Sequence, residues 1–338
     1  MRKTIHLCHS SHDEIMYRSE ADLIMGFNCL ALAILSTESR LLAEGFLTTH
    51  NHCLIQTENH KEVFSRSRYA YTRYFNAKYG RKGRLGEKTC FSLEIEGLHH
   101  MTAALNYIIR QGLHHGLATT PFAYPHCSAN AFFRKELGKS YTPTLLPDAN
   151  RYLYLPRDNR IPSDKYRMSS SGLLLREDII DTAYVEEVYI SPRNYLFQMN
   201  KASNNDQECT EQRQENDAPP ITVEIIEAGV PDFDSKAVTR FEQGRVDRNR
   251  MTDLELCEII DRRIIPLFSK ESQPTSIYGL PESTRSDICA LLWKECRENR
   301  FHSDTRGILD HRSSSASRGF LDGRYVTESQ LRRCLCIR

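Results

Sequence analysis

The sequence predicts an α+β fold for its first 140 residues, a sheet layer packed with helices. Three observations lead to this prediction. Short apolar segments typical of strands alternate with longer segments of helical periodicity. Ser19 stands where it can cap the first of these helices. The strand and helix segments follow one another closely, an order typical of one layer of sheet covered by helices.

The expected elements can be given in chain order. We expect a strand over residues 4–8, a helix over 20–35, strands over 41–47 and 53–55, and a long basic helix with a turn within 61–88. A strand over 91–95 and a helix carrying Tyr107 complete the unit. The last helix has an apolar stripe made by Leu98, Met101, Leu105, Ile108, Ile109 and Leu113. A neighbouring stripe contains His100, Tyr107, Gln111 and His114.

Composition excludes several classes of protein. The chain is 40% hydrophobic and 26% charged, and it has no apolar run of the roughly 18 residues that a membrane span needs. Its opening residues lead into an expected strand and do not resemble a signal peptide. Eleven cysteines are scattered without paired CxxC motifs, which predicts reduced thiols in a cytoplasm and no structural zinc site.

The net charge of +1 conceals a strong asymmetry. Residues 61–88 carry nine Lys or Arg and two acids, whereas residues 206–234 carry nine acids and one Arg. The net charge therefore says little about binding of nucleic acid, which depends on the charge of each segment.

Two short motifs contain the parts of a metal-dependent nuclease. In a strand, His50 and His52 would lie on one face while Asn51 points the other way. On a helix, Tyr107 and Gln111 would also share a face. If that helix packs beside the strand, two imidazoles and a carboxamide oxygen can hold a divalent cation next to a tyrosine nucleophile.

The basic helix has the composition of a surface that binds single-stranded nucleic acid. Its cations can neutralise phosphates, and its aromatic rings can stack on unpaired bases. The residues predicted to bind nucleic acid are Arg66, Arg68, Arg73, Tyr74, Lys78, Arg81, Lys82 and Arg84. An amphipathic helix with a solvated basic face and an aromatic core stripe explains the same pattern, and the two interpretations are compatible.

Four blocks of sequence, in this order and spacing, resemble the REP-associated tyrosine transposases, which are HUH-type single-tyrosine enzymes. The blocks are LTTHNHCLI at 47–55, YFNAKYGRKG at 74–83, YIIRQGLHHGL at 107–117 and PFAYP at 121–125. The resemblance covers about the first 135 residues.

The resemblance implies a ferredoxin-like antiparallel sheet with helices on one face and the two motif histidines on a central strand. It implies that His50, His52 and Gln111 bind Mg²⁺ or Mn²⁺. Tyr107 would attack single-stranded DNA at hairpin-forming repeats, leaving a 5′-phosphotyrosine and a free 3′-hydroxyl. Because the phosphotyrosine keeps the bond energy, rejoining needs no nucleotide cofactor.

Asn51 departs from the family pattern, whose middle residue is usually bulky and apolar, and it needs hydrogen-bond partners if buried. One alternative is therefore a catalytically silent descendant that binds DNA or RNA as a regulator. Another is a metal-binding module using His50, His52 and Cys53, which would leave Tyr107 unexplained. We expect His114 to be a surface histidine near a helix end.

The rest of the chain has a different character. Residues 141–202 predict an irregular segment with a helix at 176–185, and residues 203–250 predict an acidic polar linker. Residues 251–338 predict a small helical domain, with helices at 252–265, 282–298 and 326–335 and caps at Thr252 and Thr327.

The last helix resembles the second helix of helix-turn-helix modules, with Arg332 and Arg333 as candidate contacts to duplex DNA. A dimer seam or an ordinary basic surface also fits these residues. The sequence leaves open whether an active site is completed within one chain or between two copies.

Overall fold

The computed structural model describes residues 2–11, 14–139, 143–157, 159–200, 250–268, 276–303, 319–322 and 324–337. Apart from Arg250, the expected linker over 203–250 lies outside the described residues. No helix among the described residues is long and apolar enough to cross a membrane.

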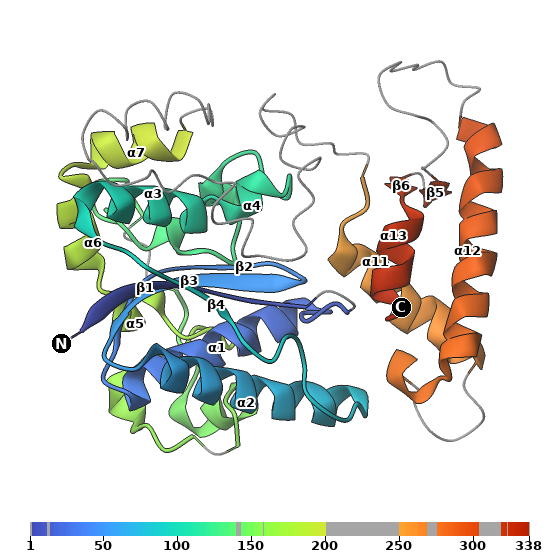
Figure 1. Cartoon of the computed structure of the whole chain (residues 1–338), viewed down its shortest axis with the longest axis horizontal. Coiled ribbons are helices and arrows are strands. Elements are labelled where there is room, and N and C mark those ends of the chain that lie inside the picture. Colours follow the sequence, from blue (N-terminus) through green and yellow to red (C-terminus); the bar gives the residue numbers. More distant parts are fainter. Residues whose placement is uncertain are drawn as a thin grey trace.

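A four-stranded antiparallel sheet forms the centre of the first structural unit (Figure 1). Its strands are β1 (Lys3–Ser10), β2 (Arg40–Phe46), β3 (His50–Thr57) and β4 (Phe91–Glu94), in the order β2-β3-β1-β4. Every pairing is antiparallel. The predicted α+β class is confirmed, and β3, which carries both motif histidines, is a central strand as expected.

Helices cover both faces of this sheet, so the expectation of helices on one face is wrong. Figure 1 shows α1 (Glu20–Ser36) and α2 (His60–Tyr79) below the sheet, and α3 (Gly97–Ile109) and α4 (Gln111–His114) above it. The cause is visible in β1 and β3, where successive side chains are buried on both faces and need cover on both.

The cap of α1 follows the sequence prediction. Ser19 and Asp22 form a capping box, each side chain bonding to the backbone of the other residue. Asp22 is fully buried and also accepts hydrogen bonds from Tyr74, Lys78 and Tyr79 of α2. The two helices are therefore tied to each other as well as to the sheet.

The segment expected to be irregular belongs to the first unit. It contains the short helices η3 (Asp148–Tyr154), η4 (Ser163–Lys165), α5 (Arg176–Ile179), α6 (Thr182–Tyr189) and α7 (Pro192–Asn200). Side chains such as Met168, Val185 and Tyr195 join the same apolar core as the sheet. The first unit thus continues to residue 200, past the expected boundary at 140.

The single helix predicted over 176–185 is wrong. The chain leaves helical geometry at Ile180, which bridges to Leu41 beside the sheet, and Asp181 then caps α6. A capping carboxylate followed by a new helix replaces the continuous helix that propensity favoured.

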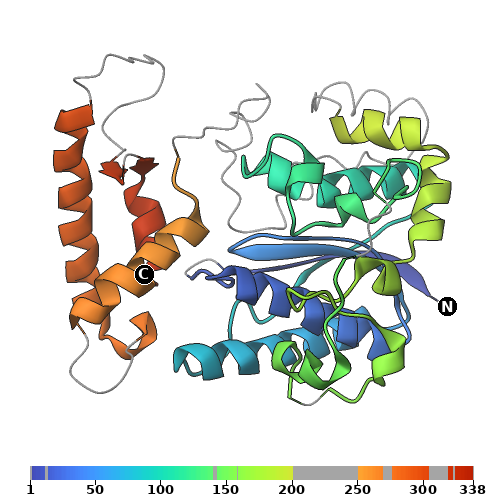
Figure 2. The ribbon, with the colours of Figure 1, turned by 180° about the vertical axis from the view of Figure 1, so that it is seen from behind.

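The second structural unit has its own core (Figure 2). It contains α11 (Asp253–Ile259), η5 (Ile260–Ile264), η6 (Ile265–Phe268), η7 (Ile277–Gly279), α12 (Glu282–Ser303), β5 (Gly319–Leu321), β6 (Arg324–Val326) and α13 (Glu328–Cys334). The predicted caps Thr252 and Thr327 are both present.

Two expectations for this unit are wrong. It is not purely helical, because β5 and β6 form an antiparallel hairpin. The helix-turn-helix resemblance also fails, because α13 follows that hairpin instead of a short turn after another helix. The strands escaped prediction because three-residue segments carry too little periodicity to detect.

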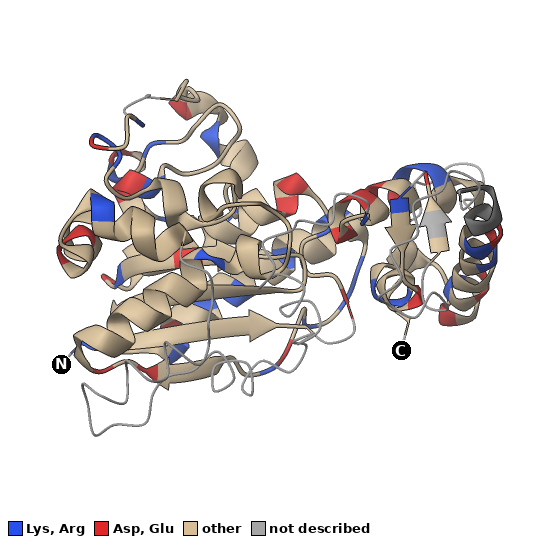
Figure 3. Ribbon diagram, turned by 90° about the horizontal axis from the view of Figure 1, so that it is seen from above, with Lys and Arg blue, Asp and Glu red and all other residues tan. Residues whose placement is uncertain are grey.

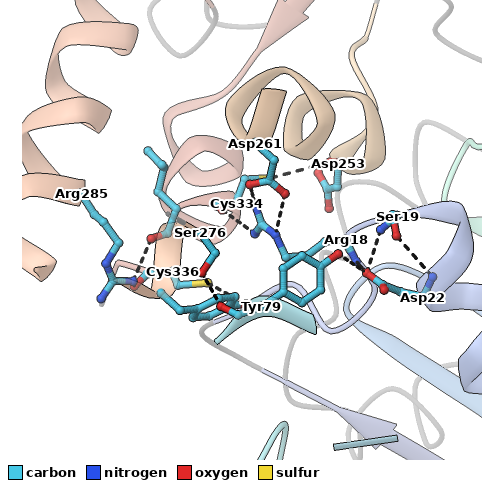
Figure 4. Close-up of polar contacts among 12 residues, drawn as sticks. Arg18, Ser19, Asp22, Tyr79, Asp253, Asp261, Ser276, Arg285, Cys334 and Cys336 are labelled. Carbon is cyan, nitrogen blue, oxygen red and sulfur yellow. Dashed lines mark hydrogen bonds and ion pairs between the residues drawn. The ribbon is translucent and has the colours of Figure 1, made fainter. Parts of the chain in front are cut away.

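The two units contact each other directly. Ile15, which precedes α1, is fully buried in the core of the second unit. Arg18 is 2% exposed and forms a two-pronged ion pair with Asp261. The Arg18 side chain also donates to the Cys334 carbonyl, as Figure 4 shows. All ten described cysteines are free thiols.

Candidate active site

His50 and His52 lie side by side on the face of β3 that is covered by α3. Both imidazoles are buried, and their ring centroids are 5.1 Å apart. The alternation of a strand explains this arrangement, since residues two apart point to one face. The third member of the motif, Asn51, points to the opposite face, where Tyr17 contacts it.

Each motif histidine has a partner at its Nδ1 atom. Thr49 Oγ1 lies 3.0 Å from His50 Nδ1, and His6 Nε2 lies 3.0 Å from His52 Nδ1. In the tautomer with its proton on Nδ1, His52 donates to His6 and keeps a lone pair on Nε2. The Cys8 thiol, 3.8 Å from this Nε2, is a weak contact. Both Nε2 atoms can therefore serve as ligands.

Tyr107 packs on these imidazoles from α3. Its ring centroid lies 5.2 Å from that of His52 and 6.0 Å from that of His6, with the rings close to perpendicular. The tyrosine is 5% exposed. On its other side the ring of His114 lies at 5.6 Å. Tyr107, the predicted nucleophile, thus packs directly against His52, a predicted metal ligand.

Gln111 does not continue the helix of Tyr107, contrary to the sequence prediction. The helix α3 ends at Ile109, and Gln111 begins α4 after the non-helical Arg110. Gln111 nevertheless stays close, because its Nε2 donates to the Tyr107 carbonyl at 3.2 Å. Burial lowers the pKa of His50, and the Gln111 carboxamide opposes this effect.

Burial keeps the histidines of this site neutral. Removal from water lowers the pKa of four of them to about 3, and that of His52 falls well below its usual value. The four are His6, His50, His114 and His115. The expectation that His114 is a surface residue is wrong, because it is buried beside Tyr107. Neutral imidazole is the form that binds metals.

The donor set fits a divalent cation in its chemistry. Gln111 Oε1 is buried and accepts no hydrogen bond from the described residues, so it is an oxygen donor left over for a ligand. With His50 and His52 it would give two nitrogens and one oxygen. The described residues contain no group of three or more His, Cys, Asp or Glu side chains that could hold a metal ion. A carboxamide oxygen would have to complete the set.

Asn51 obtains the partner that its polarity requires. Its Oδ1 accepts a hydrogen bond from the Tyr17 hydroxyl at 3.1 Å, and both residues line a cavity of about 30 Å³ beneath the sheet. That volume is enough for one water molecule. The departure from an apolar middle residue is therefore accommodated by a tyrosine, with the histidines on either side unaffected.

The basic helix α2 lies on the sheet face opposite Tyr107 (Figure 1). Several of its predicted DNA-binding residues have structural partners. Tyr74 and Lys78 bond to Asp22, Arg81 pairs with Glu14, and Arg68 donates to two backbone carbonyls after the helix. The exposed members are Arg66, Arg73, Lys78, Lys82 and Arg84, and of these Arg66 also pairs with Glu62. For all eight predicted residues, DNA binding stays a prediction.

Charge is distributed over both units, with Lys and Arg interspersed among Asp and Glu (Figure 3). The two candidate residues of α13 differ in their surroundings. Arg333 lies 3.7 Å from Asp253, whereas Arg332 is exposed. Their sequence context alone does not distinguish them.

Three site residues escaped sequence reasoning: His6, Thr49 and His115. His6 lies on β1, and only the strand register brings it diagonally to His52. His115 lies 5.1 Å from the His50 ring. The shared strand face of His6 and Cys8 was a usable signal, but nothing in the sequence showed that β1 pairs with β3.

The chain resembles a solved structure, whereas the comparisons of its sequence find no match. No protein-family model matches the sequence, and no curated protein matches it. Among solved structures, the chain is similar to a REP-associated tyrosine transposase bound to a REP hairpin. The match has 12% sequence identity and a TM-score of 0.34, and covers 42% of this chain and 82% of the other.

Proposed function

We propose that this protein is a metal-dependent tyrosine nuclease and strand transferase that cuts and rejoins single-stranded DNA at hairpin-forming repeats. The observation that supports this most is the packing of Tyr107 against His52, at 5.2 Å between ring centroids, with His50 and Gln111 alongside. A nucleophile beside a set of neutral metal ligands is the arrangement that transfer of a phosphodiester requires.

The residues have distinct roles in this proposal. His50, His52 and Gln111 would hold Mg²⁺ or Mn²⁺, and the bound ion would neutralise charge on the scissile phosphate. His6 and Thr49, each 3.0 Å from an Nδ1 atom, would hold the two imidazoles in the tautomer and orientation that direct Nε2 toward the ion. Gln111, bonded to the Tyr107 carbonyl, fixes the spacing between ligand and nucleophile.

The covalent step balances without a further reagent. Tyr107 Oη forms a bond to phosphorus, and the bond from phosphorus to the 3′ oxygen breaks. The phenol loses its proton, and the leaving 3′ oxygen gains one. The products are a 5′-phosphotyrosine and a free 3′-hydroxyl. Attack by another 3′-hydroxyl reverses the step and joins the strands, so no nucleotide cofactor is needed.

Covalent capture tests the proposal. End-labelled single-stranded hairpin oligonucleotides from the DNA flanking the gene are incubated with the full chain and Mg²⁺ or Mn²⁺, then resolved on a denaturing gel. We expect an adduct that Tyr107→Phe and a chelator each abolish. Tyr69→Phe, at an exposed tyrosine of α2, is the matched control and should leave the adduct intact.

Two other results have clear meanings. DNA or RNA binding without an adduct would reject the enzyme and favour a catalytically silent regulator. Tight Zn²⁺ binding with no affinity for nucleic acid would favour a metal-binding module that uses His50, His52 and Cys53.

A further inference from the structure

The second structural unit holds the turn that leads into β3. Thr48 Oγ1 donates to Asp253 Oδ2 at 3.1 Å, and Asp253 begins α11 of the second unit. The next residue, Thr49, contacts His50 Nδ1. The Thr48 carbonyl also accepts hydrogen bonds from the backbone of Met16 and Tyr17. A single residue, Thr49, thus separates the interface residue Thr48 from the predicted metal ligand His50.

Buried contacts fix the position of the second unit against the first. The Arg18 guanidinium is fully surrounded, with Asp261 and the Cys334 carbonyl as its partners (Figure 4). The Tyr278 ring lies 5.8 Å from that of Phe75 and 6.1 Å from that of Tyr79. Buried ionic and aromatic contacts of this kind hold one relative position of the two units.

Arg333 lies at this interface, and its contacts use only some of its hydrogen-bond donors. Its pair with Asp253 is loose, at 3.7 Å, and its side chain is 30% exposed. One terminal nitrogen donates to Ser329 at 3.2 Å, and its Nε atom has no hydrogen-bond partner among the described residues. A guanidinium has five donors in all. The contacts with Ser329 and Asp253 leave further N–H donors on the two terminal nitrogens.

Arg333 is linked to the candidate site through Asp253. Asp253 Oδ2 lies 3.7 Å from Arg333 and accepts the hydrogen bond from Thr48, two residues before His50. Arg333 therefore lies on the side of the second unit that contacts the turn before β3.

Arg332 faces a different environment, although it is adjacent in sequence. Its charge acts on the Cys289 thiol of α12, where it offsets part of the rise in pKa that burial causes. Successive residues of a helix point about 100° apart, which explains the separation. The two arginines that the sequence could not distinguish are thus distinguished by the fold.

We propose that the second unit completes the active site, with Arg333 binding a backbone phosphate of the DNA strand that is engaged at Tyr107. This inference rests on the proposed function and adds to it a phosphate-binding element supplied by the second unit. Arginine suits the task because its planar fork matches the geometry of a phosphate. Asp253 acts as a positioning residue, since it contacts both Arg333 and Thr48.

The salt dependence of DNA binding tests this inference. Affinity of the full chain for a fluorescein-labelled single-stranded hairpin oligonucleotide is measured by anisotropy over a series of salt concentrations. Loss of one phosphate contact reduces the slope of log K against log salt by about 0.7 for a single strand. We expect this reduction in Arg333→Gln. Arg332→Gln, the matched control, should keep the wild-type slope.

A second variant separates charge from structure. Arg333→Lys retains the cation and should keep the wild-type slope, whereas a purely structural role would predict a similar defect in both substitutions. The inference is overturned if Arg333→Gln and Arg332→Gln have equal slopes, whether reduced or unchanged. It is also overturned if the wild type does not bind the oligonucleotide.

The adduct assay on the same samples keeps the two proposals apart. If the wild type forms the adduct and Arg333→Gln shows no selective loss of salt slope, the proposed nuclease function is supported and this inference is rejected. If Arg333→Gln selectively loses salt slope but the wild type forms no adduct, phosphate binding by Arg333 is supported and the proposed catalysis is rejected.

Discussion

The carbonyl oxygen of Ile108 approaches Gly45 so closely that a Cβ added to the glycine would lie 2.7 Å from it. Gly45 belongs to β2 and pairs with His52 across the sheet, while Ile108 follows Tyr107 in α3. The absence of a side chain at this position lets the helix settle onto the sheet. The close approach therefore lies between the residue after Tyr107 and the strand partner of His52.

Gly45→Ala should therefore displace the nucleophile as well as destabilise the fold. Overpacking of this kind costs about 1–3 kcal/mol. Gly26→Ala is a matched control, because its Cβ would meet the Tyr17 ring at 2.5 Å on the other face of the sheet. We expect both variants to lose stability in urea titrations and only Gly45→Ala to lose the covalent adduct under folding conditions. Equal adduct yields in the two variants would refute this role.

The Tyr17–Asn51 hydrogen bond predicts a compensating pair of substitutions. Asn51→Leu leaves the buried Tyr17 hydroxyl without its acceptor, and Tyr17→Phe leaves the Asn51 carboxamide without its donor. Each should cost about 1–3 kcal/mol of unfolding free energy. The double variant should recover part of that loss, which a double-mutant cycle measures. Strictly additive losses would show that the bond contributes nothing.

His6 should govern metal affinity although it is not a predicted ligand. His6→Phe removes the partner of His52 Nδ1, so the tautomer that keeps a lone pair on Nε2 loses its support. Partners of this type are typically worth 10–100-fold in metal affinity. Calorimetric titration with Mn²⁺ measures the loss independently of DNA cleavage. His60→Phe, at a histidine on the first turn of α2, is the control and should bind as the wild type does.

Local features of the fold were predictable from the sequence, and distant contacts were not. The caps Ser19, Thr252 and Thr327 were predictable because each bonds to a backbone group three residues away. His6 meets His52 across 46 residues, and Arg18 meets Asp261 across 243. Strand register and docking decide such contacts, and a single sequence records neither.

The site itself divides in the same way. Strand alternation was enough to place His50 beside His52, and this geometry is present. Helical spacing placed Gln111 near Tyr107, but it missed the interruption at Arg110 that starts a new helix. Hydrophobic patterning also failed for His114, because a histidine buried beside a tyrosine looks the same in sequence as one at a solvated helix end.

The buried Arg18 predicts how strongly the two units are joined. Asp261→Asn leaves the guanidinium buried without its counter-charge, and breaking such a pair costs about 3 kcal/mol. Asp322→Asn is the matched control, because its pair with Arg263 is exposed on both sides and should contribute less than about 1 kcal/mol. Trp293, the one tryptophan of the chain, lies in α12 and reports unfolding of the second unit by fluorescence. Equal shifts of the urea midpoint in Asp261→Asn and Asp322→Asn would contradict the role of the Arg18–Asp261 pair in joining the two units.

His9 provides a test of how burial shapes stability against pH. Its imidazole packs against Phe64 on the face away from Tyr107, and burial, assisted by the charge of Arg68, lowers its pKa from 6.5 to about 3. Between these two values the unfolded chain binds a proton that the folded chain does not. Stability must therefore fall as the pH falls from 6.5 toward 3, and the loss from this residue is about 1.4 kcal/mol at about pH 5.5.

His9→Gln removes that proton-binding group, so the free energy of unfolding should fall by about 1.4 kcal/mol less than in the wild type between about pH 7.5 and about pH 5.5. The comparison uses the change with pH within each protein, because the substitution also alters packing at the reference pH. His60→Gln is the control, since this histidine on the first turn of α2 is only partly buried. Parallel pH profiles for the wild type and His9→Gln would mean that His9 is protonated in the folded chain, and hence that water reaches it between β1 and α2.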